Sequence, residues 1–200
     1  MRSGDGYLGY WSVSTGTATV TGAGSKWVNS GDLYVGRDGS GTLLIDAGAE
    51  VRSGSSYLGY WSGSTGTATV TGAGSKWTNS GDLYVGYYGS GTLLIEAGAE
   101  VSNAFSWPAV SYTILGGGSG STGTATVTGR GSYWGRSGDL YVGREGSGTL
   151  RVEAGAGGSS PNSDMCRDSG STGTARVTGY GSKWGNRESI SVGYDGRRKR

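Results

Sequence analysis

The sequence contains no histidine, one cysteine, two prolines and one phenylalanine among its 200 residues. Without histidine, the chain lacks the commonest general base and metal ligand of proteins. The single cysteine, Cys166, excludes an intrachain disulfide. Collagen is excluded as well, because proline is scarce and the 44 glycines do not recur at every third position.

The chain also contains few large apolar residues and has a small net charge. Leu, Ile, Val and Phe number 30 of 200, a fraction that is typical of disordered chains when net charge is high. Here the net charge is only +2, and it falls to −2 without the basic residues 197–200, because 13 basic side chains then face 15 acidic ones. We expect no nucleic-acid partner, since the positive charge rests on this terminal run.

Long apolar runs are missing throughout the chain. The first residues, MRSGDGYLGYW, contain no apolar core of a signal peptide. No run approaches the ~20 apolar residues that a membrane-spanning helix needs. We therefore expect no membrane insertion by this segment.

What the sequence does contain is repetition. The phrase STGTATVTG occupies residues 14–22 and returns at 64–72 and 121–129, with STGTARVTG at 171–179. Residues 1–50 and 51–100 differ at eight positions. The dipeptide Gly-Thr begins at 16, 41, 66, 91, 123, 148 and 173. The deeper period is thus 25 residues, with one insertion of seven residues near 104–111.

Each period alternates small or branched apolar residues with polar ones, which predicts strands. Short strands, glycine-rich turns and a period of about 25 residues favour an all-β fold, a right-handed parallel β-helix (β-solenoid) of seven or so coils. A propeller or a sandwich is the structural alternative, although propeller blades need about 40–50 residues. Seven coils would form a rod of roughly 35 Å.

The predicted organisation is a single β-solenoid over residues 1–200. It comprises four double-coil repeats of 50 residues: 1–50, 51–100, about 101–157 with the insertion, and a degenerate copy at about 158–200. Residues 157–168 replace the strand that contains YLGYW in the first two copies. The sequence leaves open whether 102–118 and 157–168 are ordered.

The strand pattern also predicts which side chains enter the core. Ala18 and Val20 share the inner face of the first strand, and we expect Gly16 to turn the corner before it. The expected inner pairs alternate small and large along the rod: Ala18/Val20, Leu43/Ile45, Ala68/Val70, Leu93/Ile95, Ala125/Val127, Leu150/Val152 and Ala175/Val177. Threonine dominates the expected outer face.

Three motifs recur in fixed order, namely G-T-A-T-V-T-G-x-G-S-x-W, N-S-G-D-L-Y-V-G and G-x-G-T-L-x-I. The stretch GTATVTGAGSKWTNSGDLYVGYYGSGTLLIEAGAEV at 66–101 resembles the autotransporter-associated repeat, also known as the type V secretion and PEP-CTERM-associated repeat. The resemblance covers most of 1–100 and 119–156, and more weakly 169–193.

The resemblance implies a β-helical passenger region of a large secreted or surface-displayed bacterial protein, often described as an autotransporter or adhesin. It implies an extracellular or outer-membrane-surface location and no catalytic residues. Met1 stands where Val51 stands in the second copy. A GTG codon encodes valine internally and methionine at a start, so we expect this chain to be an internal segment of a longer reading frame.

Aromatic rows are the candidate binding surface. Trp27, Trp77, Trp134 and Trp184 recur at one repeat position, and Tyr34, Tyr84 and Tyr141 at another. Such rings could stack on sugars or on another protein; alternatively, they close the end of the core or shield a corner. Possible partners are a polysaccharide, a host or cell-surface protein, or a second copy at the solenoid ends.

The sequence points to no catalytic residue, metal ligand or cofactor. The acidic residues recur with the repeat, whereas an active site needs its carboxylates once. The glycine-rich signature of calcium-binding β-rolls is absent. We expect a structural or adhesive segment rather than an enzyme. A glycan-binding module is the alternative, followed by a polysaccharide-degrading β-helix enzyme.

Overall fold

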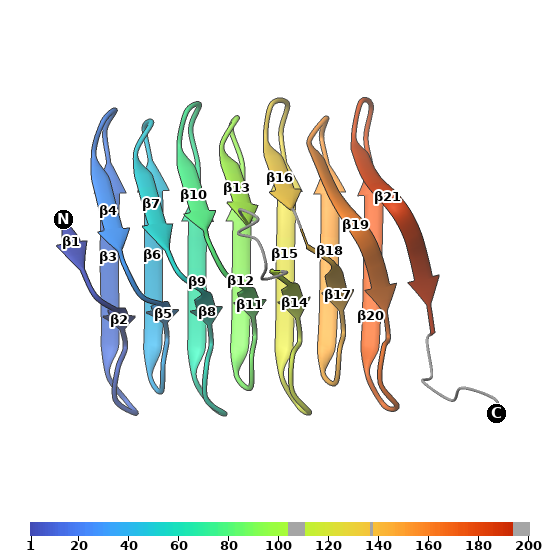
Figure 1. Cartoon of the computed structure of the whole chain (residues 1–200), viewed down its shortest axis with the longest axis horizontal. Coiled ribbons are helices and arrows are strands. Elements are labelled where there is room, and N and C mark those ends of the chain that lie inside the picture. Colours follow the sequence, from blue (N-terminus) through green and yellow to red (C-terminus); the bar gives the residue numbers. More distant parts are fainter. Residues whose placement is uncertain (104–110, 137, 194–200) are drawn as a thin grey trace.

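The computed structural model describes residues 1–103, 111–136 and 138–193, and every regular element in these ranges is a β-strand. The strands form coils that stack side by side from the N-terminal end of a rod to the C-terminal end (Figure 1). Strands of neighbouring coils pair in parallel, about 25 residues apart. The predicted parallel β-solenoid of about seven turns is therefore confirmed.

Each coil contributes strands to three rows. The first row is a seven-stranded sheet of β3 (Thr15–Thr21), β6 (Ser40–Asp46), β9 (Thr65–Val70), β12 (Ser90–Ile95), β15 (Thr122–Thr128), β18 (Ser147–Glu153) and β20 (Thr172–Thr178). The second row holds β1 (Arg2–Ser3), β4 (Lys26–Asn29), β7 (Glu50–Ser53), β10 (Lys76–Asn79), β13 (Glu100–Asn103) and β16 (Tyr133–Arg136). The third row holds β2 (Gly6–Leu8), β5 (Leu33–Val35), β8 (Ser56–Leu58), β11 (Leu83–Val85), β14 (Thr113–Leu115) and β17 (Leu140–Val142).

The degenerate segment at 157–168 keeps the coil. A single long strand, β19 (Gly157–Met165), pairs with both β16 and β17 and so joins the second and third rows. The last strand, β21 (Lys183–Val192), pairs along β19 with one register shift between Ser160 and Asn162. Of the inserted segment, residues 104–110 lie outside the described residues, and β14 follows it in register with β11.

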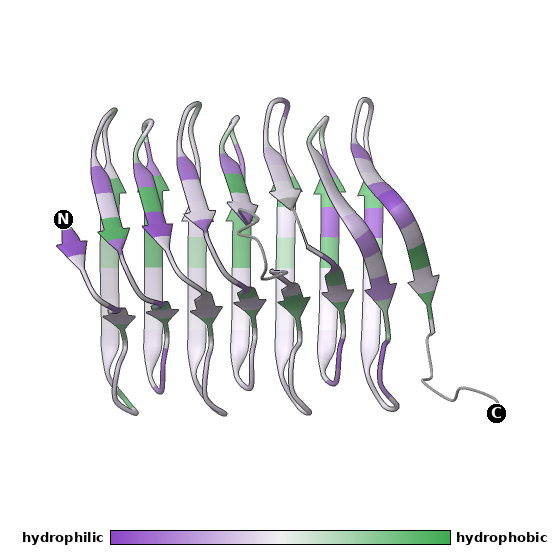
Figure 2. Ribbon diagram, in the orientation of Figure 1, coloured by the Kyte–Doolittle hydropathy of each residue, from purple (hydrophilic) through white to green (hydrophobic). Residues whose placement is uncertain are grey.

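The core follows the predicted inner pairs. Leu43, Ile45, Ala68 and Val70 are buried, and the register places Leu43 on Ala68 and Ile45 on Val70. Because each small pair stacks on a large one, the narrow interior fills without a long apolar run. Short hydrophobic segments accordingly recur in coil after coil (Figure 2).

The three rows compensate one another in volume within each coil. The coil that carries the small Ala68 carries the large Trp77 in its second row. The next coil reverses this order, with Leu93 in the first row and Val101 in the second. Trp77 and Val101 are direct partners in the ladder, so large and small residues alternate in both rows.

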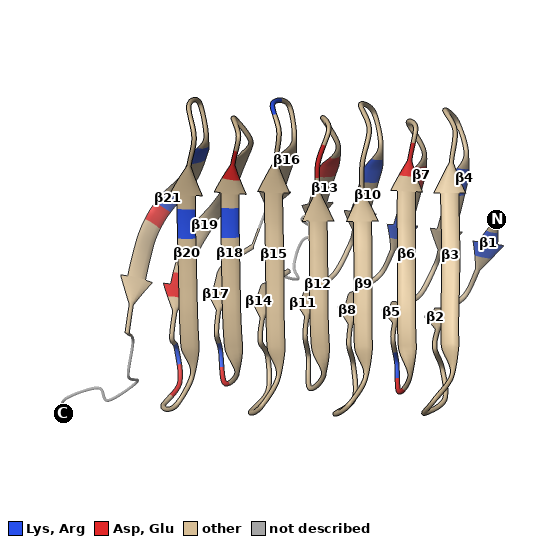
Figure 3. Ribbon diagram, turned by 180° about the vertical axis from the view of Figure 1, so that it is seen from behind, with Lys and Arg blue, Asp and Glu red and all other residues tan. Residues whose placement is uncertain are grey.

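The outer face of the seven-stranded sheet shows the expected threonine row. Its members pair in register from coil to coil: Thr17, Thr42, Thr67, Thr92, Thr124, Thr149 and Thr174. Charge on this sheet is sparse and lies mainly near the strand ends, apart from the basic residues of β18 and β20 (Figure 3). Those residues are Arg151 and Arg176, which are register partners.

The glycine of each Gly-Thr dipeptide has a different role from the one expected. Gly16 lies inside β3 and does not turn a corner. Instead, a Cβ atom built there would lie 2.5 Å from the backbone nitrogen of Gly9, and one at Gly91 would lie 2.1 Å from that of Gly86. The prediction was wrong about the turn: this glycine is required because the strand passes directly against the corner that precedes it.

We expect Gly91→Ala to lower the free energy of unfolding by about 3 kcal/mol, at the upper end of overpacking costs, because backbone atoms on the opposite side cannot rotate away. Gly185→Ala is the matched control, since its Cβ would meet nothing closer than 3.9 Å and its φ is not positive. Denaturant unfolding followed by circular dichroism measures both. Equal stability of the two variants would contradict the close contact.

Candidate functional site

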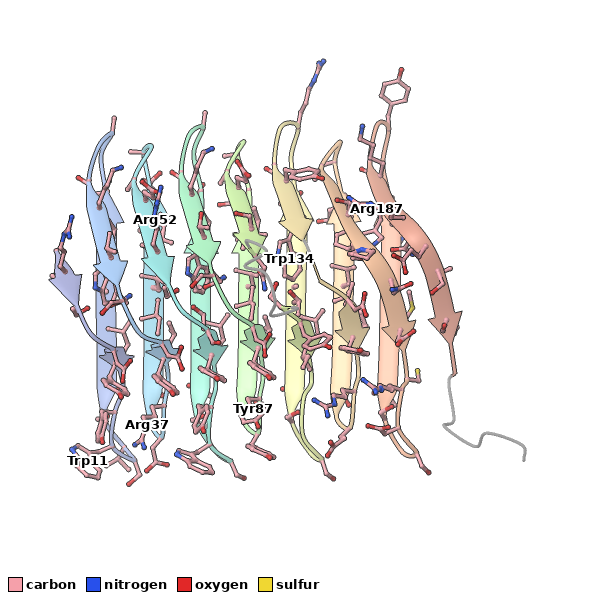
Figure 4. All side chains as sticks on the ribbon, in the orientation of Figure 1. Trp11, Arg37, Arg52, Tyr87, Trp134 and Arg187 are labelled. Carbon is pink, nitrogen blue, oxygen red and sulfur yellow. The ribbon has the colours of Figure 1, made fainter. Side chains whose placement is uncertain are left out.

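The tryptophan row lies mainly in the core. Trp27 is 7 % exposed, whereas Trp77 and Trp134 are completely buried, and Trp184 packs half-buried against the core cluster. Figure 4 shows Trp134 within the body of the rod, away from the edge where Trp11 lies. The structure thus places these three rings in the core and not on an exposed surface, nearer to the alternative in which the rings close the core than to a binding surface.

The inward direction follows from strand geometry. In β10 (Lys76–Asn79), Lys76 and Thr78 share one face and Trp77 and Asn79 share the other, and the second pair is buried. The polar Asn79 is accommodated because its Oδ1 accepts hydrogen bonds from the Ser53 hydroxyl at 2.9 Å and the Ser56 hydroxyl at 2.6 Å. A buried polar ladder thus accompanies the tryptophans.

The predicted tyrosine row is only partly continuous. Tyr34 and Tyr84 belong to one ladder through Tyr57, with ring centroids 4.9 Å and 5.0 Å apart and nearly parallel planes. Tyr7 extends this ladder by stacking on Tyr34 at 5.1 Å. Tyr141 lies beyond Ile114, which occupies the ring position in β14, so the structure separates it from the others.

A second set of rings flanks the ladder. Tyr60 meets both Tyr34 and Tyr57 edge-on, at 5.1 Å and 5.0 Å between centroids. Tyr10 and Tyr87 take equivalent places in other coils. Edge-to-face and offset-stacked contacts are the favoured geometries of aromatic pairs, so the rings hold one another in fixed orientations.

The outermost rings are exposed. Trp11 is 69 % exposed, Trp61 is 44 % exposed and Tyr88 is 43 % exposed. Trp61 stacks on Tyr88 with centroids 6.3 Å apart. We call the exposed and half-buried rings of the third row and its corner the aromatic face: Tyr7, Tyr10, Trp11, Tyr34, Tyr57, Tyr60, Trp61, Tyr84, Tyr87 and Tyr88.

One arginine joins the aromatic face. The guanidinium carbon of Arg37 lies 4.5 Å from the ring centroid of Tyr10, within cation–π distance. Trp11, Arg37 and Tyr87 lie along the same edge of the rod (Figure 4). The first four coils carry the aromatic face, and the second of them has no aromatic residue at the corner after its third-row strand. Arg37 therefore continues the aromatic face in that coil.

The corner residues of the aromatic face were missed by sequence reasoning, which considered Tyr34, Tyr84 and the tryptophans of KWVN and KWTN. The signal was the motif YLGYW at 7–11 and 57–61. Its glycines, Gly9 and Gly59, have φ values of 66° and 69°. This left-handed turn directs the next two side chains, such as Tyr60 and Trp61, outward beside the tyrosine ladder.

Aspartates at the neighbouring corner connect the coils. The Asp5 carboxylate accepts a hydrogen bond from the backbone N–H of Asp32 at 2.9 Å, and Asp32 accepts one from that of Ser55 at 2.7 Å. Asp82 repeats the contact with the N–H of Tyr112 at 2.7 Å. These repeated acids therefore bind backbone of the following coil, which is a structural role.

Burial governs the ionisation of the tyrosine ladder. It is the largest cause that raises the pKa of Tyr57, to about 12, and the Asp32 carboxylate adds to it. Burial likewise raises the pKa of Tyr34 and Tyr84 above the ordinary value. The hydroxyl groups thus stay neutral over the physiological range and can donate hydrogen bonds, as Tyr84 does to Asp82 at 3.0 Å.

Within the described ranges, no group of three or more Asp, Glu or Cys side chains could hold a metal ion. No helix long and apolar enough to cross a membrane occurs in the part of the chain that the structure describes.

Comparisons with models of protein families, with curated proteins and with solved structures found no match. The chain is accordingly described by its own architecture. Its fold is that of a structural repeat protein, a parallel β-solenoid, and one edge of the solenoid carries the aromatic face.

We expect the ladder tyrosines to ionise late. Because the folded state holds the pKa of Tyr57 near 12 against 10.0 in the unfolded chain, its contribution to stability is complete below pH 10 and is lost as pH rises toward 12. Tyrosinate absorbance during alkaline titration measures this, with denatured protein as the reference. Tyr57→Phe should remove one of the tyrosines that ionise only at high pH. Titration curves of native and denatured protein that coincide would contradict the burial of the ladder.

Proposed function

We propose that this chain is a structural and adhesive segment of a secreted or surface-displayed bacterial protein of the autotransporter-passenger type. The resemblance of residues 66–101 to autotransporter-associated repeats supports the class and the extracellular location. The single observation that carries the adhesive part is the aromatic face, a surface of exposed and half-buried rings over the first four coils.

The structural role follows from the continuity of the coils. Parallel pairing runs unbroken through the seven strands of the first row, from β3 to β20. At ~4.8 Å per strand spacing, the row separates its first and last strands by about 30 Å. Because each coil contacts chiefly its neighbours, coils can be added without rearranging the rest, as in other repeat proteins.

The adhesive role follows from the chemistry of the face. Flat amphipathic rings bind sugar rings and protein surfaces by stacking, and they lose little conformational entropy when held by neighbours. The stacked rings of Trp61 and Tyr88 line a cleft together with Tyr60 and Tyr87. A glycan-binding module that uses this cleft is the second candidate function.

A polysaccharide-degrading enzyme has less support. The carboxylates nearest to the tyrosine ladder, such as Asp32 and Asp82, accept hydrogen bonds from backbone N–H groups of the next coil. A general acid or a nucleophile would need a carboxylate pair directed at a substrate. We therefore propose binding without catalysis.

Self-association at the ends of the solenoid is the proposed second interaction. An apolar hollow at the first coil is lined by Leu8, Ala18, Val20 and Trp27. In the last coil, Val177 is 45 % exposed and Ile190 is 58 % exposed. The outer edges of β3 and β20 have no strand partner among the described residues, so a second copy could extend the seven-stranded sheet at either end.

The adhesive role predicts a specific loss of binding. We expect the double variant Trp61→Ala, Tyr88→Ala to bind insoluble polysaccharides and fixed host cells at least tenfold more weakly, which corresponds to about 1.4 kcal/mol. Thr67→Ala, Thr92→Ala is the matched control, because both threonines are exposed on the seven-stranded sheet. Circular dichroism checks that both variants fold. Unchanged adhesion of the folded aromatic variant would refute the proposal.

End-to-end contact predicts concentration-dependent association of the 200-residue chain. We expect light scattering to show a rising mean mass with concentration, and Val20→Lys combined with Val177→Lys to suppress the rise by placing charges on both apolar ends. Thr19→Lys combined with Arg176→Lys is the control on the outer faces of the same strands. A monodisperse monomer at high concentration would contradict this contact.

A further inference from the structure

The fifth coil interrupts the aromatic face. Its sequence is ILGGG at 114–118, where the third coil has YLGYW at 57–61. Ile114 pairs with Tyr84 on one side and Tyr141 on the other, so one ring of the ladder is missing. The two corner rings are replaced by Gly117 and Gly118, whose N–H groups bond to Gly86 and Tyr87 of the preceding coil.

A cleft with a volume of about 360 Å³ opens at this interruption. This volume is at the lower end of the ~300–1,000 Å³ that is usual for small-molecule sites. The cleft is lined by Asp82, Tyr84, Tyr112, Ile114, Tyr141, Arg144 and Arg167. The lining thus combines ring faces with two guanidinium groups, a combination that no other coil offers among the described residues.

The two arginines reach the cleft from successive coils. Arg144 follows β17 and Arg167 follows β19, and the guanidinium carbon of Arg167 lies 4.6 Å from the ring centroid of Tyr141. The Nε of Arg144 is buried without a hydrogen-bond partner. Neither guanidinium takes part in an ion pair among the described residues. Buried donors of this kind normally have an acceptor, and an anionic oxygen of a ligand could supply one here.

The nearby carboxylates do not fill this need. Asp82 is engaged by the backbone N–H of Tyr112 and the hydroxyl of Tyr84. Asp139 accepts a hydrogen bond from the Asn162 side chain at 2.9 Å, and Asp164, beside Tyr141 in the ladder, is no ion-pair partner of the arginines. The guanidinium groups therefore remain available to a ligand.

The shape of the cleft indicates the kind of ligand. Tyr84 and Tyr141 are two coils apart in the ladder, and Ile114 fills the position between them and is only 2 % exposed, so a ligand would lie over the outer edges of these rings and not between them. Tyr112 lies beside this position, with its ring centroid 5.9 Å from that of Tyr141. A pyranose ring can pack on the half-buried ring of Tyr112, and a carboxylate on the pyranose fits a guanidinium. We propose that this cleft binds a uronic-acid residue of an acidic polysaccharide.

Single-stranded nucleic acid is the competing ligand, since bases also stack on tyrosine and phosphates bind arginine. It is disfavoured because such binding needs a basic groove that follows several phosphates. Here Asp139, Glu145 and Asp168 lie next to the cleft residues in sequence or register, and only Arg144 and Arg167 are basic.

Titration calorimetry of the full chain with tetragalacturonate tests the proposal. We expect Arg144→Gln and Arg167→Gln each to weaken binding at least tenfold, and Ile114→Tyr to abolish it by restoring the missing ring. Arg151→Gln is the matched control, because Arg151 is exposed on the outer face of the seven-stranded sheet, away from the cleft. The methyl ester of the same saccharide keeps the rings and removes the charge, so it should bind at least tenfold more weakly.

Three outcomes would overturn the proposal: no binding of tetragalacturonate, equal binding of its methyl ester, or tighter binding of oligothymidylate. Circular dichroism of Arg144→Gln and Ile114→Tyr separates loss of binding from loss of fold. The variant Thr67→Ala, Thr92→Ala, on the exposed face of the seven-stranded sheet, should bind tetragalacturonate normally. Arg144→Gln tests the cleft, whereas Trp61→Ala, Tyr88→Ala tests the adhesive face, so the two proposals are tested by different variants.

Discussion

The whole solenoid depends on one close backbone contact that recurs in each coil. At seven glycines, the strand of the first row passes so near to the preceding corner that a Cβ atom would lie 2.0–2.5 Å from backbone atoms: Gly16, Gly41, Gly66, Gly91, Gly123, Gly148 and Gly173. This approach makes the coil flat and its interior narrow. A narrow interior needs few large side chains, which is why a chain with so little leucine, isoleucine and valine can fold.

Because the packing of the interior is the same along the rod, the coils differ mainly on their outer surface. The largest differences lie at the turn that follows each third-row strand. There the repeated motif YLGYW places aromatic rings in register, and each ring is oriented by its neighbours above and below. The fifth coil has none of these rings and carries Ile114, Gly117 and Gly118 in their places. The repetition provides an extended surface, and its interruption provides a cleft lined by two arginines.

Much of this fold could be predicted from the sequence, because a fixed period and strict alternation together determine register. The pairing of Leu43 with Ala68 follows from the 25-residue spacing alone. The direction of Trp77 did not follow, because Asn79 shares its face and a polar partner concealed that the face is buried. The outward turn at Gly59 depends on a backbone conformation, which residue patterns do not encode directly.

The alternation of large and small side chains has a consequence for how this gene can change in length. Ala68 with Trp77 fills one coil, and Leu93 with Val101 fills the next, so the unit of good packing is two coils. Recombination between the near-identical 50-residue copies would remove or add a complete unit and keep every large residue against a small one. Loss of a single 25-residue coil, such as the one that contains Ala68, would stack Leu43 directly on Leu93. Viable length variants should therefore differ by even numbers of coils.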